Sequence, residues 1–215
     1  MVGSTRIVLG LGAALLVFGA LTALADEPRE DVDYVLISPP RVPTDKNKIE
    51  VIEFFYYGCD ACNRFEPRLQ SWLAKLAPDV AFRRVPALRR TAWVPLARMF
   101  FALEQLGQLE RLHAQVYRAI HDEGLDLGSA ADRGEWADTV GLDRSRLEDA
   151  LESDAVSAQV QRAHDATIAY AVRATPSFAV DGKYLISGSP TGGLETLLPT
   201  VDRLLDKART SRREP

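Results

Sequence analysis

The chain has 215 residues, of which 26% are charged and 47% hydrophobic, a balance typical of a folded globular protein rather than a disordered one. Its 30 acidic and 26 basic side chains give a formal net charge of −4 at pH 7, and no basic stripe runs along it. The composition therefore argues against a nucleic-acid-binding protein. Four arginines lie close together in the sequence, namely Arg83, Arg84, Arg89 and Arg90. They could form part of the solvated surface or a site for an anion or a partner.

The first 25 residues have the features of a secretory signal peptide. Arg6 precedes an apolar stretch over residues 7–21, and Ala23-Leu24-Ala25 is a small-x-small site of the kind after which signal peptidase cuts. The stretch is shorter than the roughly 20 residues that a transmembrane helix needs. We therefore expect residues 1–25 to be removed during export, with an uncleaved N-terminal anchor as the alternative.

A strand–helix–strand unit follows. Residues 34–37 predict a short strand that ends before Pro39. Residues 49–57 are nearly continuous in their apolarity and rich in β-branched and aromatic side chains, which predicts a strand buried on both faces in the middle of a sheet. Apolar side chains then recur every three or four positions over residues 59–76, which predicts a helix, and residues 80–85 predict the next strand.

The remainder of the chain is first helical and then returns to strands. The apolar spacing over residues 95–172 is helical almost throughout. Residues 177–180 and 183–186 predict two strands, because Asp181-Gly182 between them is typical of a β-hairpin. A last amphipathic helix is expected from about residue 194 to residue 208. This order predicts an α/β protein in which one mixed sheet carries an all-helical insertion.

Cys59 and Cys62 are the only two cysteines, and they lie where the buried strand ends and the helix begins. At the first turn of a helix, unpaired N–H groups and the helix dipole stabilise a thiolate and lower the pKa of the thiol. We therefore expect Cys59 to be the attacking thiol. Cys62, one turn further along and less exposed, is expected to be the resolving thiol, as disulfide exchange requires.

Three alternatives to redox chemistry could account for the cysteine pair. A zinc site needs about four ligands, and His113, His121 and His164 are not spaced like zinc ligands, so no metal is expected and these histidines are interpreted as structural or surface residues. A purely structural disulfide would close too small a loop to remove much chain entropy. Two inert buried cysteines are the third alternative. The prediction is a redox-active Cys59–Cys62 disulfide that needs no other cofactor.

Two segments resemble the signatures of the DsbA family of disulfide-forming proteins of the bacterial periplasm. The first signature corresponds to residues 51–66, including Tyr56-Tyr57-Gly58-Cys59-Asp60-Ala61-Cys62 and Phe65-Glu66, and the second to residues 172–178. The resemblance spans nearly all of the chain after the signal peptide. It implies a thioredoxin-like mixed sheet formed by residues 26–91 and 173–215, with a helical domain inserted at residues 92–172.

The resemblance also implies roles for three residues outside the cysteine pair. Pro176 would follow a cis peptide bond and place the Thr175 backbone where an extended substrate can pair with it, and the alternative is an ordinary trans proline before a strand. Glu53 would be a buried acid that exchanges a proton with Cys62, because burial in an apolar strand raises the pKa of a carboxyl. Its alternative is a charge that faces solvent from an edge strand.

The chain departs from the family pattern between the two cysteines. Many members have a histidine where this chain has Ala61, and Asp60 places a negative charge next to Cys59. We expect both differences to raise the pKa of Cys59 and to make the disulfide less oxidising.

The activity implied by the resemblance is the introduction of disulfide bonds into unfolded or reduced exported proteins in the periplasm. The protein would act as a monomer and would be reoxidised by a DsbB-like membrane quinone reductase. One alternative is a disulfide reductase or isomerase on the same scaffold, although isomerases of this compartment generally carry an added dimerisation domain. Another is a non-catalytic protein that holds substrates in the groove beside Pro176.

Overall fold

The computed structural model describes residues 27–187 and 193–213, so the predicted signal peptide lies outside the described residues. Within these ranges five strands form one sheet in the order β1-β5-β4-β2-β3. Strand β2 pairs in parallel with β3 and antiparallel with β4, which confirms the predicted mixed sheet. The strands are β1 (Val35–Leu36), β2 (Ile49–Phe55), β3 (Val80–Pro86), β4 (Ser177–Val180) and β5 (Tyr184–Ser187).

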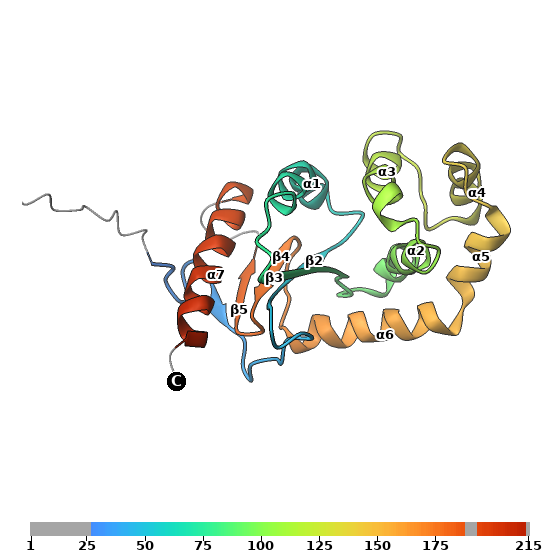
Figure 1. Cartoon of the computed structure of the whole chain (residues 1–215). Coiled ribbons are helices and arrows are strands. Elements are labelled where there is room, and N and C mark those ends of the chain that lie inside the picture. Colours follow the sequence, from blue (N-terminus) through green and yellow to red (C-terminus); the bar gives the residue numbers. More distant parts are fainter. Residues whose placement is uncertain (1–26, 188–192, 214–215) are drawn as a thin grey trace, which may run out of the picture.

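Most of the helices lie together in the sequence between β3 and β4. The helices are α1 (Asp60–Leu73), α2 (Val94–Gln105), α3 (Leu109–His121), α4 (Ala130–Thr139), α5 (Arg144–Glu152), α6 (Asp154–Ala169) and α7 (Leu197–Arg213). The five from α2 to α6 form a helical body beside the sheet, and the long α6 leads back to it (Figure 1). This confirms the all-helical insertion. In the part of the chain that the structure describes, no helix is both long and apolar enough to cross a membrane.

Strand β2 lies inside the sheet, and all seven of its residues are buried, as predicted. Its two faces pack against different layers. Val51 belongs to the apolar cluster formed with α1 and α7, whereas Ile52 belongs to the cluster shared with the helical insertion. The strand ends two residues earlier than predicted because the chain turns after Phe55, where the Cys59 N–H donates to the Tyr56 carbonyl at 3.0 Å. This turn carries the chain from the sheet into α1.

The predicted β-hairpin is present, but its turn is one residue longer than expected. Val180 pairs with Tyr184, so residues 181–183 form the turn. Asp181 and Gly182 both have positive φ values, 54° and 64°. A Cβ atom at Gly182 would lie 2.0 Å from the Arg41 carbonyl oxygen, so only glycine fits this turn.

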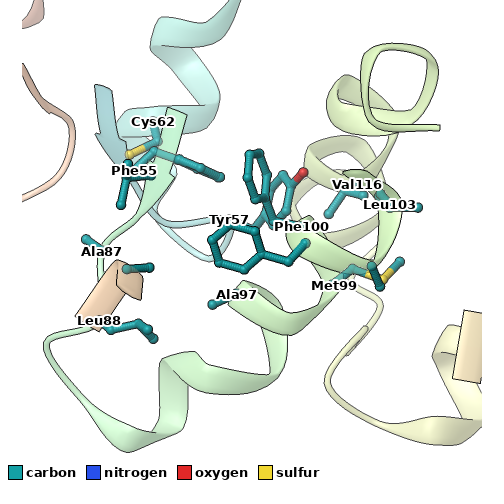
Figure 2. Close-up of a cluster of buried hydrophobic side chains, with 14 of the residues drawn as sticks. Phe55, Tyr57, Cys62, Ala87, Leu88, Ala97, Met99, Phe100, Leu103 and Val116 are labelled. Carbon is teal, nitrogen blue, oxygen red and sulfur yellow. The ribbon is translucent and has the colours of Figure 1, made fainter. Parts of the chain in front are cut away.

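The apolar cluster between the sheet and the insertion reaches the predicted active site. Cys62 and Phe55 lie at one side of it, and Tyr57, in the turn after β2, lies close to Phe100 of α2 (Figure 2). Phe55 and Phe100 are fully buried, and their ring centroids are 5.2 Å apart. Cys62 therefore belongs to the same apolar cluster as the residues of the insertion.

Candidate active site

Cys59 is the N-cap residue of α1, as the sequence predicted. Its backbone is extended, with φ −91° and ψ 111°, and its carbonyl accepts from the Asn63 N–H at 3.0 Å. Its Sγ atom accepts from the Cys62 backbone N–H at 3.4 Å, which is the contact that a capping side chain makes. The sulfur therefore faces the unpaired N–H groups and the positive end of the helix dipole.

These surroundings lower the pKa of Cys59 to about 5, from an ordinary value of 9.0. The largest contribution is a hydrogen bond with the Cys62 side chain. A hydrogen bond with Thr175 and the backbone N–H groups of Cys62 and Ala61 contribute in the same direction, while partial burial opposes them. At neutral pH, Cys59 is therefore present almost entirely as the thiolate.

Cys62 has the opposite environment. It is 1% exposed, whereas Cys59 is partly accessible, and both are free thiols in the structure. Burial, followed by contact with the Cys59 thiol and the negative charge of its thiolate, raises the pKa of Cys62 far above the ordinary thiol value. The pair thus consists of an accessible thiolate and a buried, protonated thiol.

The second signature lies against the first. The Thr175–Pro176 peptide bond is cis, as predicted, so the trans alternative is wrong. The Thr175 carbonyl lies 3.4 Å from the Cys59 Sγ atom, although the two residues are 116 positions apart in the sequence. Binding of substrate at Thr175 and Pro176 stays a prediction.

Glu53 is buried on the interior strand β2, near enough for its charge to raise the pKa of Cys62. It is 1% exposed, and Arg84 Nε donates to its carboxylate at 3.0 Å, so the edge-strand alternative is wrong. Burial raises the pKa of Glu53 to about 8, although the positive charge of Arg84 acts in the opposite direction. A proton exchange between Glu53 and Cys62 stays a prediction.

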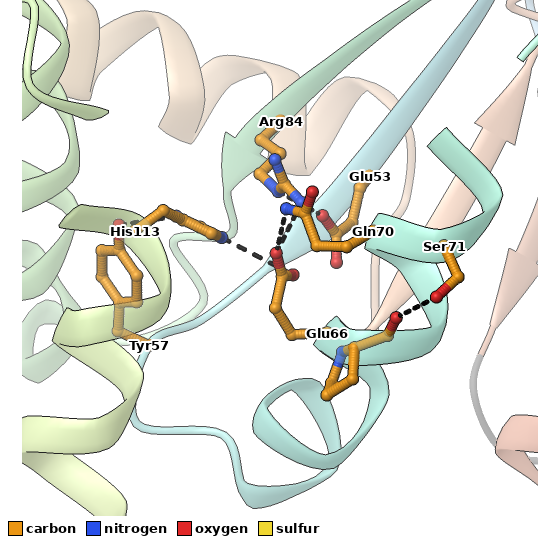
Figure 3. Close-up of polar contacts among 8 residues, drawn as sticks. Glu53, Tyr57, Glu66, Gln70, Ser71, Arg84 and His113 are labelled. Carbon is orange, nitrogen blue, oxygen red and sulfur yellow. Dashed lines mark hydrogen bonds and ion pairs between the residues drawn. The ribbon is translucent and has the colours of Figure 1, made fainter. Parts of the chain in front are cut away.

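Glu53 belongs to a larger buried polar group that the sequence did not reveal. Arg84 also donates to Glu66 of α1 at 2.9 Å, and His113 of α3 lies between Glu66 and Tyr57 (Figure 3). His113 was interpreted only as a structural or surface residue. The parallel register pairs Glu53 with Arg84, so a correct pairing of the two predicted strands could have found that contact. The contact with His113 depends on how the insertion packs on α1, for which the sequence carries no local signal.

The other two histidines differ from each other. His121 Nε2 lies 2.7 Å from the Tyr57 carbonyl oxygen, close to the turn that precedes Cys59. His164 is on the surface, with 47% of its side chain exposed, and contacts Asp165 at 3.4 Å. The interpretation of the histidines as structural or surface residues therefore fits all three, since His113 is buried.

The two residues between the cysteines face different surroundings. Asp60 is exposed and forms an ion pair with Arg64, one helical turn away, which offsets part of its charge. Ala61 contributes its backbone N–H to the Cys59 thiolate. The pKa of Cys59 is low even with this dipeptide in place. The size of the effect of Asp60 and Ala61 on it stays a prediction.

The four clustered arginines do not form one surface patch. Arg83 donates to Glu50 at 3.1 Å, and Arg84 belongs to the buried group described above. Arg89 and Arg90 line a surface pocket of about 340 Å³ together with His164. Among residues 27–187 and 193–213, no three histidine, cysteine or acidic side chains are grouped as a metal site would need.

A thioredoxin-like sheet whose Cys-x-x-Cys pair starts a helix, with one thiolate and one buried thiol, defines a thiol–disulfide oxidoreductase. A family model described as a DSBA-like thioredoxin domain matches residues 79–197. The thiol:disulfide interchange protein DsbA of Pseudomonas aeruginosa is 34% identical over 191 residues, which are 89% of this chain and 90% of that protein. The chain therefore belongs to the DsbA family, and it is an enzyme that introduces disulfide bonds.

Further relatives support the same assignment. The DsbA of Bordetella parapertussis is 37% identical over 201 residues, which are 93% of this chain and 95% of that protein. The crystal structure of Pseudomonas aeruginosa DsbA has a TM-score of 0.80 at 34% identity and covers 85% of this chain and 95% of that one. The structure of DsbA from Xylella fastidiosa has a TM-score of 0.77 at 30% identity, over 83% and 96% of the two chains. The likeness extends over both halves of the sheet and the helical insertion between them.

Proposed function

We propose that the protein oxidises reduced, newly exported proteins through Cys59 as the exchanging sulfur and Cys62 as its buried partner. The observation that carries this proposal is the contrast between the two thiols. The pKa of Cys59 is about 5 at an accessible helix start, whereas the pKa of Cys62 is raised by burial. Only Cys59 is placed to form a mixed disulfide with a large substrate.

The exchange starts from the oxidised protein, in which Cys59 and Cys62 are joined. A substrate thiolate attacks the Cys59 sulfur, a substrate–Cys59 disulfide forms, and Cys62 leaves with the bonding electron pair and takes up a proton. A second substrate thiolate then attacks the substrate sulfur and releases Cys59 as a thiolate. The substrate loses two electrons and gains a disulfide, and the protein gains those two electrons as two reduced sulfurs.

The low pKa of Cys59 favours this direction. A thiolate that is stabilised in the reduced protein makes the disulfide a stronger oxidant, and for a two-electron couple each 1.4 kcal/mol corresponds to about 30 mV. Because Cys59 is only partly buried, solvent screens part of this stabilisation, and the gain is on the order of tens of millivolts. The thiolate is also a good leaving group in the second step of the exchange.

Substrate would bind beside the cis-proline. The Thr175 carbonyl already lies next to the Cys59 sulfur, so an extended chain that pairs with the Thr175 backbone would bring its own cysteine to the same place. This contact is made by backbone groups and carries little sequence preference. Pro176 and Thr175 would therefore accept many different reduced proteins.

The remaining parts of the proposal come from the family. Removal of residues 1–25 would release residues 26–215 as a monomer into the periplasm, where a DsbB-like membrane quinone reductase would reoxidise the cysteine pair. The disulfide itself would be the redox group, with no metal or organic cofactor. Residues 26–91 and 173–215 would form the thioredoxin-like domain and residues 92–172 the inserted helical domain.

A single-turnover assay tests the proposed function. The oxidised protein is mixed, without any other oxidant, with one equivalent of a reduced and unfolded protein that contains two cysteines. We expect one disulfide to form in the substrate for each protein molecule that becomes reduced. Substrate thiols that stay reduced would contradict the oxidase. In a second mixture, transfer of electrons from the reduced protein to an oxidised substrate would support the reductase alternative.

Glu53 is expected to supply the proton that Cys62 needs when it leaves. Glu53→Gln should slow the attack of an aromatic thiol on the oxidised protein by about tenfold or more. In the unmodified protein this rate should fall as the pH rises toward about 8, because Glu53 loses its proton there, and the variant should lack this step. The step should lie somewhat below the value for the reduced protein, because the oxidised protein lacks the Cys59 thiolate charge that helps to raise the pKa of Glu53. Stopped-flow rates between pH 7 and 9, with a thiol whose own pKa lies below 6, isolate the effect.

The matched control is Glu50→Gln. Glu50 is also buried on β2, but it pairs with Arg83 rather than with Arg84. Its replacement should leave the step near pH 8 in place. If Glu53→Gln retains that step, another group supplies the proton.

A further inference from the structure

A chain of buried polar groups connects the helical insertion with Glu53. The Tyr57 hydroxyl lies 2.8 Å from His113 Nδ1, and His113 Nε2 lies 3.6 Å from Glu66 Oε2 (Figure 3). Glu66 Oε1 accepts from Arg84 at 2.9 Å, and Arg84 also donates to Glu53 at 3.0 Å. The sulfur chemistry and the family resemblance assign no role to His113.

The contacts of His113 determine which ring nitrogen carries the hydrogen. Burial raises the pKa of Tyr57 well above its ordinary value, so its hydroxyl stays protonated and can donate to Nδ1. Burial also lowers the pKa of His113, so the ring is neutral at pH 7 and its single hydrogen lies on Nε2. Neither His113 Nε2 nor Glu66 Oε2 has a hydrogen-bonding partner among the described residues, because the 3.6 Å between them is longer than a hydrogen bond. The Nε2–H group therefore faces the Glu66 carboxylate alone.

One cation is shared by two buried carboxyl groups. Arg84 contacts both Glu53 and Glu66, and the negative charge of Glu66 raises the pKa of Glu53. The pKa of Glu66 is lowered, although its burial acts in the opposite direction. Its contacts with His113, Arg84 and Gln70 outweigh that burial. Two such carboxyls titrate as a coupled pair, and the first proton goes to the one whose anion is stabilised less.

We propose that His113 is a positioning residue that keeps Glu66 ionised and thereby leaves the shared proton on Glu53, next to the cysteine pair. This role rests on the proposed function and deepens it, because a contact made by the helical insertion would then determine whether Glu53 carries a proton. Without the Nε2–H donor, the Glu66 anion is less stable and takes up the proton more readily. Arg84 then forms an ion pair with Glu53 alone, and Glu53 ionises at lower pH.

The surrounding charges are compatible with this assignment. A cleft of about 650 Å³ between α1, β3, α2 and α3 opens onto Gln70, Arg84 and His113, so protons can exchange between the buried group and solvent. The charged and titratable groups that face His113 and Glu66 are Glu53 of β2, Arg84 of β3, Tyr57, Tyr117 of α3 and, around the cleft, Arg83, Glu104 and Glu110. Of these, only Arg84 contacts both carboxyl groups.

The test compares two replacements of His113. His113→Leu removes this contact, and we expect the pH midpoint of Glu53 to fall by an amount set by how far the Glu66 midpoint rises toward it. His113→Gln keeps an amide N–H for Glu66 and should restore much of the midpoint. The midpoint is read from the infrared signal of the protonated Glu53 carboxyl, assigned by its absence in Glu53→Gln. An unchanged midpoint in His113→Leu overturns the proposal.

A double-mutant cycle separates a route through Glu66 from a direct effect. Glu66→Gln should lower the Glu53 midpoint by itself, because it removes a neighbouring negative charge. His113→Leu should then add nothing in the Glu66→Gln background. An equal shift in both backgrounds would mean that His113 does not act through Glu66, and would refute the proposal.

Two further measurements keep the outcomes distinct. If His113→Leu does not fold, Tyr57→Phe removes only the hydroxyl that orients the ring, and it should shift the midpoint in the same direction by a smaller amount. No shift in Tyr57→Phe would then count against the proposal. If the infrared midpoint moves but the thiol-exchange rate does not follow it, His113 controls the Glu53 proton as proposed and the role of Glu53 in exchange is wrong.

Discussion

Replacing Cys59 by alanine should abolish disulfide transfer, whereas replacing Cys62 by alanine should leave a protein that reacts once and stays attached to its target. The accessible Cys59 thiolate can attack a disulfide in a target protein. In Cys62→Ala no neighbouring thiol can release the mixed disulfide that results. In Cys59→Ala the remaining thiol is 1% exposed and protonated, so it should react at least a hundred times more slowly.

The measurement is the amount of mixed disulfide on a non-reducing gel after incubation with a protein that contains a disulfide. Both variants should remain folded at the temperature of the assay, as thermal unfolding of the reduced proteins would show, which separates reactivity from folding. We expect nearly complete capture by Cys62→Ala and almost none by Cys59→Ala. Equal capture by both variants would contradict the assignment of the two thiols.

The reactivity of Cys59 toward iodoacetamide should titrate with a pKa of about 5. At pH 6 its thiolate fraction should exceed that of a thiol with a pKa of 9 by about a thousandfold. The lower basicity of the thiolate makes it less nucleophilic and removes most of this advantage, since nucleophilicity falls by about half a log unit for each pKa unit. The net rate should therefore be roughly ten times that of an ordinary thiol, and far greater than that of Cys62.

The same pKa predicts how the reduced protein responds to acid. The pKa of Cys59 is lower in the folded protein than in an unfolded chain, so ionisation stabilises the folded reduced form above pH 5. This contribution is complete above the ordinary thiol pKa of 9.0 and should be lost progressively as the pH falls from there to about 5. The oxidised form has no such thiol, so the gap in unfolding free energy between the two forms should narrow at low pH. A gap that stays constant from pH 7 to pH 4 would argue against a low pKa.

The variant Ala61→His tests how the residue between the cysteines affects the pKa of Cys59. A histidine at this position adds a donor to the thiolate and should lower the pKa of Cys59 further, with a gain in oxidising power of tens of millivolts. Asp60 should affect the pKa of Cys59 less than the sequence alone suggests, because Arg64 forms an ion pair with it on the surface. The ultraviolet absorbance of the thiolate reports the pKa directly.

The features that the sequence predicted depend on short-range patterns. The apolar run of β2, the Asp-Gly hairpin and the cysteine pair at a helix start are each encoded within about ten residues. The exact ends of these elements were less predictable: β2 stops at Phe55, and the hairpin turn includes Lys183. In both places the backbone turns according to tertiary contacts, such as the approach of Arg41 to Gly182.

The buried polar group could be predicted only in part. Glu53 was identified through the family resemblance, and its partner Arg84 follows once β2 and β3 are paired in register. Arg84 was instead grouped with three neighbouring arginines as a candidate surface cluster, because its sequence neighbours do not show that it is buried. His113 and Glu66 are 47 positions apart and meet only because α3 packs on α1. Such contacts arise from the assembly of the insertion onto the sheet.

The most direct test of the central claim is the equilibrium potential of the Cys59–Cys62 pair against glutathione at pH 7. An oxidase that stabilises the Cys59 thiolate should have a potential well above that of glutathione, towards the value of about −120 mV that characterises DsbA. The fraction of reduced protein can be followed by alkylation across a series of glutathione ratios. A potential near −270 mV, the value of thioredoxin, would contradict an oxidase and identify the protein as a reductase.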